Sequence, residues 1–173
     1  MNILAAFKPI RLFVFDVDGV LTDGSLLLLN NGEQVRRMNI KDGYALQLAI
    51  KEGYDIVVIS GASNDAVVQR LNKLGIANVE MGVADKWAVL QKYLQQYNLQ
   101  PGQVLYMGDD IPDYAVMQKV GLACCPADAV AEIKSIAAYI SPINGGEGCV
   151  RDVIEKVLKL HGRWGLSHGI ASR

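Results

Sequence analysis

Compact apolar runs that stop at polar or glycine residues recur along the chain. They are Leu12–Phe15, Ile56–Ile59 and Val104–Met107. Runs of valine, isoleucine, leucine and phenylalanine without polar alternation are typical of strands that are buried on both faces. The pattern therefore predicts three central strands of one sheet.

Stretches with the period of an amphipathic helix lie between and after these runs. They are Asp42–Lys51, Asn64–Leu74, Lys86–Tyr97 and Ile111–Val120. Gly53, Gly75 and Gly121 follow three of them, as glycine often does at a helix C-terminus. The alternation predicts an α/β fold: a three-layer, Rossmann-like parallel sheet with helices on both faces and right-handed crossovers. We expect a single domain over residues 1–173.

The segment from about residue 25 to 38 breaks this alternation. Asn31-Gly32 lies between two short extended stretches, which is the strongest local signal for a β-hairpin. Leu26–Leu29 place apolar side chains on both faces of this hairpin, and a two-stranded ribbon cannot bury both faces against its own domain. Two interpretations stay open: the leucines complete the chain's own core, or they form a subunit interface.

Composition narrows the class of protein. Of the residues, 51% are hydrophobic, and 17 Lys plus Arg balance 18 Asp plus Glu, which excludes an intrinsically disordered chain. This balance leaves no basic stripe for phosphate contacts, so we expect no nucleic-acid partner. Charged residues interrupt the apolar start of the chain, and no apolar run approaches the ~20 residues of a membrane span. We expect no membrane partner.

Cysteine usage and the last residues complete the outline. Cys124, Cys125 and Cys149 form neither a disulfide framework nor a metal knuckle, which fits a reducing compartment and hence the cytoplasm. The segment of about 161–173 is polar and contains glycine, so we expect a flexible tail. Both histidines, His161 and His168, lie in it.

Polar side chains follow each predicted strand. They are Asp16, Asp18, Ser60, Asp109, Asp110 and Asp113. In a parallel α/β sheet, ligands bind outside the carboxyl ends of the strands, so we expect these residues to lie at one edge. Carboxylates without histidine suit Mg²⁺ and disfavour zinc. The sequence therefore predicts a magnesium site there.

A carboxylate nucleophile beside Mg²⁺ suits attack on a phosphoryl group. Asp16 and Asp18 lie two residues apart after a buried strand, so one can form an aspartyl-phosphate while the other transfers protons. Ser60 and Gly61, before a helix start, offer a hydroxyl and backbone N–H groups to phosphate oxygens. Lys86 offers a positive charge. The combination indicates phosphoryl transfer.

These residues resemble the four sequence motifs of the haloacid dehalogenase superfamily. The matching segments are Phe15–Gly24, Ile59–Gly61, Lys86 and Gly108–Asp113. Asn39–Tyr44, the glycine-rich Gly145–Gly148 and the absence of an inserted cap domain resemble, within it, the 3-deoxy-D-manno-octulosonate 8-phosphate phosphatase family. The resemblance runs from about Leu12 to Leu160.

The resemblance implies a role for each matching residue. It makes Asp16 the nucleophile and Asp18 the general acid and base. It places Mg²⁺ on the Asp16 carboxylate, the Asp18 backbone carbonyl and Asp109, and phosphate on Ser60 and Lys86. Further candidates, Asp110 and Asp113, would orient these ligands and Lys86.

The resemblance also implies a substrate and an assembly. The substrate would be the eight-carbon sugar-acid phosphate, whose product is a precursor of the lipopolysaccharide inner core. Cap-free relatives are homotetramers in which the hairpin and the C-terminal tail of a neighbour close each site, and that neighbour would cover the leucines. We therefore expect a homotetramer.

Two positions depart from the pattern of the family. Ala62 and Glu147 stand where arginine is usual, and Glu147 and Lys73 resemble the related 2-keto-3-deoxynononate 9-phosphate phosphatases. That branch, however, tends to carry an acid at the position of Ala62. Arg70, one helical turn before Lys73, could meet a substrate carboxylate, or both could lie on a solvated helix face. The nine-carbon substrate stays an alternative.

Two other classes of protein share part of this pattern. A phospho-accepting signalling domain shares the parallel sheet, the acid cluster, a hydroxyl residue and a lysine, but here the second strand closes on Ser60 and the acidic doublet follows the strand Val104–Met107. A catalytically silent scaffold does not need an intact set of site residues. The order of the motifs favours the phosphatase.

Overall fold

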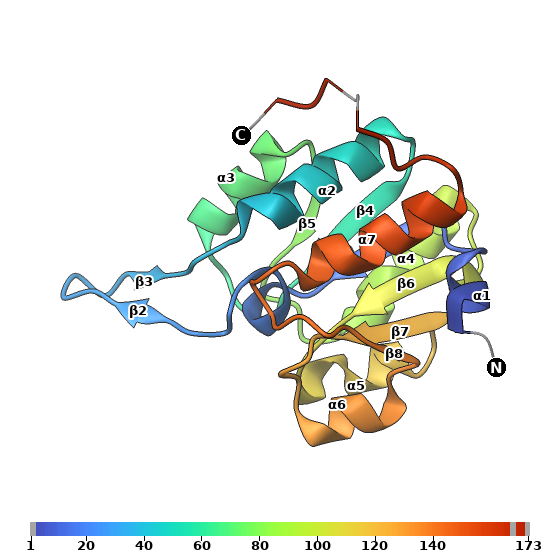
Figure 1. Cartoon of the computed structure of the whole chain (residues 1–173). Helices are drawn as coiled ribbons and strands as arrows, with labels where there is room; N and C mark the ends of the chain where they lie inside the picture. Colours follow the sequence, from blue (N-terminus) through green and yellow to red (C-terminus); the bar gives the residue numbers. More distant parts are fainter. Residues whose placement is uncertain (1–2, 167–168, 172–173) are drawn as a thin grey trace.

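The computed structural model describes residues 3–166 and 169–171 of the chain. Six parallel strands form one sheet with β1 near its centre (Figure 1). In sheet order they are β5 (Asn78–Glu80), β4 (Asp55–Ile59), β1 (Leu12–Phe15), β6 (Val104–Met107), β7 (Leu122–Cys125) and β8 (Tyr139–Ile140). The predicted α/β sheet and its three central strands are confirmed.

Helices cover both faces of this sheet. One face carries α1 (Ile3–Phe7), α2 (Ile40–Lys51), α3 (Asp65–Lys73) and α7 (Cys149–Leu160), and the other carries α4 (Lys86–Tyr97), α5 (Ile111–Met117) and α6 (Ala131–Ile136). Successive residues of β1 point to opposite faces, so Phe13 packs in the first layer and Val14 in the second. Burial on both faces explains why the central strands are uniformly apolar.

A two-stranded hairpin projects from the body between β1 and α2 (Figure 1). It consists of β2 (Leu27–Leu28) and β3 (Gln34–Val35), paired antiparallel around a turn that includes Gly32. The exposed fractions of Leu27 and Leu28 are 63% and 70%. The hairpin is as predicted, and its leucines do not complete the core of their own chain.

Some element boundaries differ from those expected. Helix α5 ends at Met117 rather than Val120, and the chain passes through Gln118 into the turn before β7. Helix α2 begins earlier, at Ile40, because the Asn39 side chain accepts a hydrogen bond from the backbone of Lys41. The edge strands β5 and β8 and the short helix α6 carry too few residues for a periodic signal. A 3₁₀ turn, η2 (Pro101–Gln103), precedes β6.

The start of the expected tail packs on the body. His161 stacks on Tyr54, and Trp164 meets the ring of Tyr44 edge-on at 6.2 Å between centroids. Residues 167–168, which include His168, and 172–173 lie outside the described residues. These contacts tie the first tail residues to the face that carries α2 and α7, and flexibility over 161–173 stays a prediction.

The structure also bears on the expected absence of a membrane span and on the state of the cysteines. Among the described helices, none combines the length and the apolar character needed to cross a membrane. Cys124, Cys125 and Cys149 are free and buried.

Candidate active site

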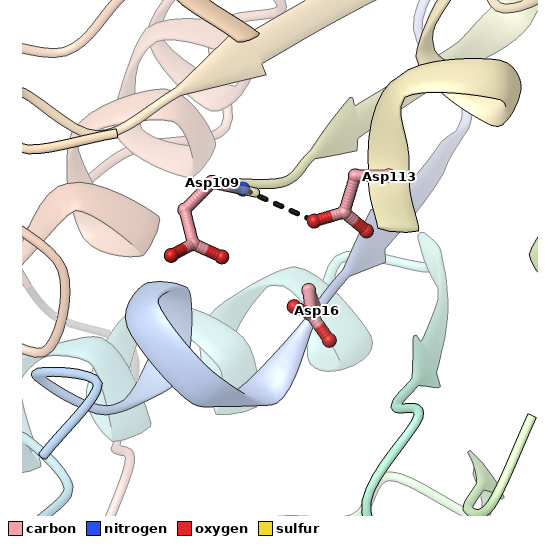
Figure 2. Close-up of side chains that lie close together, drawn as sticks. All are labelled: Asp16, Asp109 and Asp113. Carbon is pink, nitrogen blue, oxygen red and sulfur yellow. Dashed lines mark hydrogen bonds between the residues drawn. The ribbon is translucent and has the colours of Figure 1, made fainter. Parts of the chain in front are cut away.

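Three carboxylates meet at the carboxyl ends of β1 and β6. Asp16 follows β1 directly, Asp109 lies just after β6, and Asp113 lies in the first turn of α5 (Figure 2). One oxygen atom from each lies within 4.8 Å of the other two. The backbone N–H of Asp16 donates to the carbonyl of Met107 at 3.1 Å, which continues the sheet pairing into the site. Sheet pairing therefore brings Asp16 and Asp109 together.

Asp113 organises the side chains around it. It is fully buried, and its Oδ1 accepts hydrogen bonds from Lys86 Nζ and from the Tyr106 hydroxyl, each at 2.7 Å. Its Oδ2 accepts from the backbone N–H of Asp109 at 3.1 Å. Lys86 Nζ also lies 3.0 Å from Asp16 Oδ1. The lysine is thus held between two carboxylates.

The negative charge of the three clustered carboxylates is only partly balanced by nearby positive charge. Burial, and then the charge of Asp113, raise the pKa of Asp16 to about 7, although Lys86 opposes them. Burial and then Asp16 and Asp113 raise the pKa of Asp109 to about 8. Burial lowers the pKa of Lys86, but the neighbouring carboxylates outweigh this effect and the net shift is upward. One lysine does not neutralise three clustered acids.

This donor set fits a hard divalent cation. Asp109 Oδ1 is buried without a hydrogen-bond partner among the described residues, so it is available as a ligand. Asp16 offers a second oxygen, whereas Asp113 already binds Lys86 and Tyr106. Such oxygen ligands suit Mg²⁺. The side chain of Asp18 is not in this group, and a contribution from its backbone carbonyl stays a prediction.

Two glycines allow the loop after β1 to reach these acids. The helical turn η1 (Val17–Leu21) has non-helical backbone at Asp18 and Gly19, and Gly19 has φ of +87°. A Cβ at Gly19 would lie 1.9 Å from Asp109 Oδ2. On the other side of the turn, a Cβ at Gly145 would lie 1.9 Å from the Gly19 carbonyl oxygen. The turn is therefore packed tightly between the metal ligand and the glycine-rich segment.

The carboxylate of Asp18 is bound by an arginine that the sequence analysis did not single out. Arg36, just after β3, donates from Nε to Asp18 Oδ1 at 2.6 Å and from Nη2 to Oδ2 at 3.2 Å. The Arg36 side chain is only 4% exposed. In sequence it adjoins Arg37 next to an exposed hairpin, so no local pattern distinguishes it from a solvated charge.

Ser60 and Gly61 follow β4, the strand next to β1. Ser60 is buried, and its Oγ accepts from the backbone N–H of Ala62 at 3.2 Å. Helix α3 begins only at Asp65, with Asn64 as its N-cap. Ser60 and Gly61 therefore precede this helix, as expected, but residues 62–64 separate them from its first turn. A contact with phosphate stays a prediction.

The remaining candidates lie further out. Asp110 is the N-cap of α5 and accepts from the backbone N–H of Ile111 at 2.7 Å, so its carboxylate serves the helix rather than Lys86. Arg70 lines a cavity of about 670 Å³ between the hairpin base and α3, together with Arg36. Lys73 lies at the end of α3 and lines a separate hollow with Arg70. Arg70 thus shares a cavity with Arg36, the partner of Asp18, whereas Lys73 does not line that cavity.

Comparison with known proteins gives consistent matches. Residues 78–154 match the family model described as haloacid dehalogenase-like hydrolase. A 3-deoxy-D-manno-octulosonate 8-phosphate phosphatase of Yersinia pestis is 39% identical over 170 residues, covering 96% of this chain and 91% of that relative. The corresponding phosphatase of Escherichia coli K12 is 36% identical over 162 residues, covering 94% and 86%.

A solved structure adds a similarity of fold. The phosphatase of the same description from Moraxella catarrhalis, in complex with magnesium, phosphate and a KDO molecule, superposes with a TM-score of 0.88 at 30% identity. The match covers 91% of each chain.

Proposed function

Because this chain belongs to the 3-deoxy-D-manno-octulosonate 8-phosphate phosphatase family of haloacid dehalogenase-like hydrolases, we propose that its strand-end acids hydrolyse that sugar phosphate. The products are the free sugar acid, a precursor of the lipopolysaccharide inner core, and inorganic phosphate. The observation that carries the proposal is the group formed by buried Asp16, part-buried Asp109 and the Asp113-bound Lys86. It combines a nucleophile, an open metal ligand and a fixed positive charge.

Mg²⁺ is the cofactor that this donor set suits. The carboxylates of Asp16 and Asp109 would hold it, with the backbone carbonyl of Asp18. When bound, Mg²⁺ neutralises charge on the phosphoryl oxygens.

The reaction follows from the roles of the side chains. Asp16 attacks phosphorus, the bond from phosphorus to the sugar oxygen breaks, and Asp18 gives its proton to that oxygen. Water then attacks the phosphorylated Asp16, passes a proton to Asp18 and releases phosphate. Lys86, 3.0 Å from Asp16, would bind the phosphoryl oxygens, and Ser60 would contribute its hydroxyl.

The nine-carbon sugar-acid phosphate is the alternative substrate. Glu147 and Lys73 favour it because they resemble the nine-carbon branch. The absence of the arginines that the eight-carbon family usually carries at positions 62 and 147 favours it as well. The curated relatives that match nearly the whole chain carry the eight-carbon name, which favours the main proposal. A phospho-accepting signalling domain has no support among these relatives.

A phosphate-release assay with both sugar phosphates tests the proposal. We expect Mg²⁺-dependent release with kcat/KM at least tenfold higher for the eight-carbon substrate, and no release after chelation. Asp16→Asn should abolish turnover, because the amide cannot form the phosphoenzyme. Mass spectrometry must exclude deamidation of the variant back to aspartate. Near wild-type release by a verified Asp16→Asn variant would contradict the nucleophile assignment.

Assembly and location extend the proposal. We propose a homotetramer in which the hairpin and the C-terminal tail of neighbours cover each site. It is supported by the exposed Leu27 and Leu28 and by a site that has no cap domain of its own. The free, buried cysteines support a cytoplasmic location, because thiols stay reduced there.

A further inference from the structure

Arg36 holds the Asp18 carboxylate in a two-pronged ion pair. Its Nε and Nη2 donate to different oxygens of the carboxylate, at 2.6 Å and 3.2 Å. Such a fork fixes the plane of the carboxyl group as well as its position. Among the described residues, Arg36 is the hydrogen-bond donor to this carboxylate, so it determines where the Asp18 side chain points.

The arginine is itself held by the base of the hairpin. Its Nη1 donates to the Gln34 carbonyl at 3.3 Å, and the same carbonyl accepts from Asn64 Nδ2 at 3.1 Å. Asn64 caps α3, so the hairpin base is anchored to the body of the domain. The side chain of Arg36 is 4% exposed against 34% for Asp18. Arg36 is thus the more enclosed side chain of the pair and is hydrogen-bonded to the hairpin backbone as well, so Asp18 is the group that it orients.

We propose that Arg36 is a positioning residue for Asp18. Proton transfer to the leaving oxygen requires a protonated carboxyl group within hydrogen-bond reach of that oxygen. The fork holds the ionised form of Asp18, so to act as the acid the side chain keeps Oδ1 on Arg36 Nε and carries on Oδ2 the proton that the attacking water passes to it in each turnover. The backbone alone does not provide this placement, because Asp18 lies in the non-helical part of η1 and its side chain is partly exposed. Arg36 therefore acts through Asp18. This inference rests on the proposed function.

The leaving group gives the most specific test. A sugar oxygen is a poor leaving group and needs the proton, whereas p-nitrophenolate leaves without one. Because kcat/KM reports the steps up to cleavage of the phosphorus–oxygen bond, it isolates this proton transfer. For Arg36→Gln we expect kcat/KM to fall roughly 30-fold or more with the sugar phosphate. With p-nitrophenyl phosphate it should stay within about threefold of wild type, because general-acid help is not needed.

Three further variants sharpen the test. Arg37→Gln is the matched control, since Arg37 adjoins Arg36 but is 71% exposed and pairs with Asp23. It should leave kcat/KM unchanged for both substrates. Arg36→Lys keeps the charge and loses the fork, so it should recover part of the activity. In an Asp18→Asn background, Arg36→Gln should add no further loss, because residues that act through one another are not additive.

Other results overturn the proposal in distinguishable ways. An equal loss with both substrates would indicate a structural role, and a rise in KM at constant kcat would place the substrate's own carboxylate on Arg36. A full additional loss in the Asp18→Asn background would show that Arg36 acts independently. If the wild type released no phosphate with Mg²⁺, the proposed function would fail as well. Melting temperatures of all variants separate these results from unfolding.

Discussion

Asp113 is fully buried, and it both holds neighbouring groups in place by hydrogen bonds and adds negative charge to the site. Its two oxygens accept from Lys86, Tyr106 and the backbone of Asp109, and the Lys86 and Tyr106 side chains are themselves buried. It also raises the pKa of Asp16 and of Asp109. One buried carboxylate therefore couples the position of Lys86 to the protonation of the two acids.

Asp113→Asn is expected to destabilise the protein by about 2 kcal/mol or more. The amide group would face a donor, either the N–H of Asp109 or Lys86, and leave it unsatisfied in the interior. Asp110→Asn is the control, because Asp110 is exposed and asparagine caps helices equally well, so its effect should stay within about 0.5 kcal/mol. Urea unfolding of both variants measures the difference. Equal stabilities would contradict the role of Asp113.

Stability should depend on pH and on metal through the same acids. The pKa of Asp16 is raised to about 7, that of Asp109 to about 8 and, by burial, that of Asp42 to about 6. The folded protein therefore keeps protons that the unfolded chain releases near pH 4. Without metal, the free energy of unfolding should fall as the pH rises from about 4 to about 8.

Mg²⁺ should stabilise the protein more at pH 8 than at pH 6, because it binds the ionised acids and competes with protons. Urea unfolding with chelator and with saturating Mg²⁺ at both pH values measures this. Asp109→Asn should weaken both the pH slope and the Mg²⁺ effect. A metal-free protein that gains stability across this pH range would contradict the assignment.

At the scale of elements, the turn η1 depends on the segment that precedes α7. The backbone N–H of Gly146 donates to the Val20 carbonyl at 2.9 Å, and Gly145 packs directly on the Gly19 carbonyl. By sequence the segment Gly145–Gly148 resembles a family pattern, and the sequence indicates no physical role for it. The structure supplies one: only a segment without side chains packs this closely behind the turn that carries Asp18.

Gly145→Ala is expected to displace η1 and to lower kcat/KM at least tenfold, because the added Cβ would lie 1.9 Å from the Gly19 carbonyl oxygen. A tenfold change corresponds to about 1.4 kcal/mol in the barrier. Gly102→Ala is the matched control, since its Cβ would meet no atom within 4 Å. Phosphate release by both variants is the measurement. Unchanged kinetics for Gly145→Ala would show that the turn tolerates movement.

At the scale of the molecule, the hairpin carries apolar side chains that the described part of the chain leaves exposed. Leu27 and Leu29 are 63% and 39% exposed and lie on one face of the hairpin, whereas Leu28 lies on the other at 70%. Apolar side chains on both faces of a projecting ribbon favour burial against other subunits. The hairpin base also holds Arg36, so the proposed assembly would be connected to Asp18 through one element.

If the proposed tetramer forms, the double substitution of Leu27 and Leu29 by Asp is expected to dissociate it, because unpaired charges are costly to bury. The kcat/KM should fall while the circular dichroism of the α/β body is retained. Asn30→Asp adds a charge at the hairpin tip and serves as control. Light scattering measures the mass of each, and a monomeric wild type at micromolar concentration would contradict the proposed assembly.

The sequence by itself determined where the sheet lies and which residues end its strands. Strands buried on both faces must be apolar throughout, so Leu12–Phe15 and Val104–Met107 are visible as runs, and the parallel topology then brings Asp16 and Asp109 to one edge. Asn31-Gly32 likewise marked the hairpin by local turn chemistry. These features depend on period and on neighbours in sequence.

Only the tertiary structure decided which charges pair. Arg36 and Asp18 are 18 residues apart, and Lys86 and Asp113 are 27 apart, so no periodicity relates the partners. Their pairing depends on how the hairpin base, η1 and the N-termini of α4 and α5 pack. The raised pKa values of Asp16 and Asp109 have the same origin, since burial and the spacing of like charges exist only after the chain has folded.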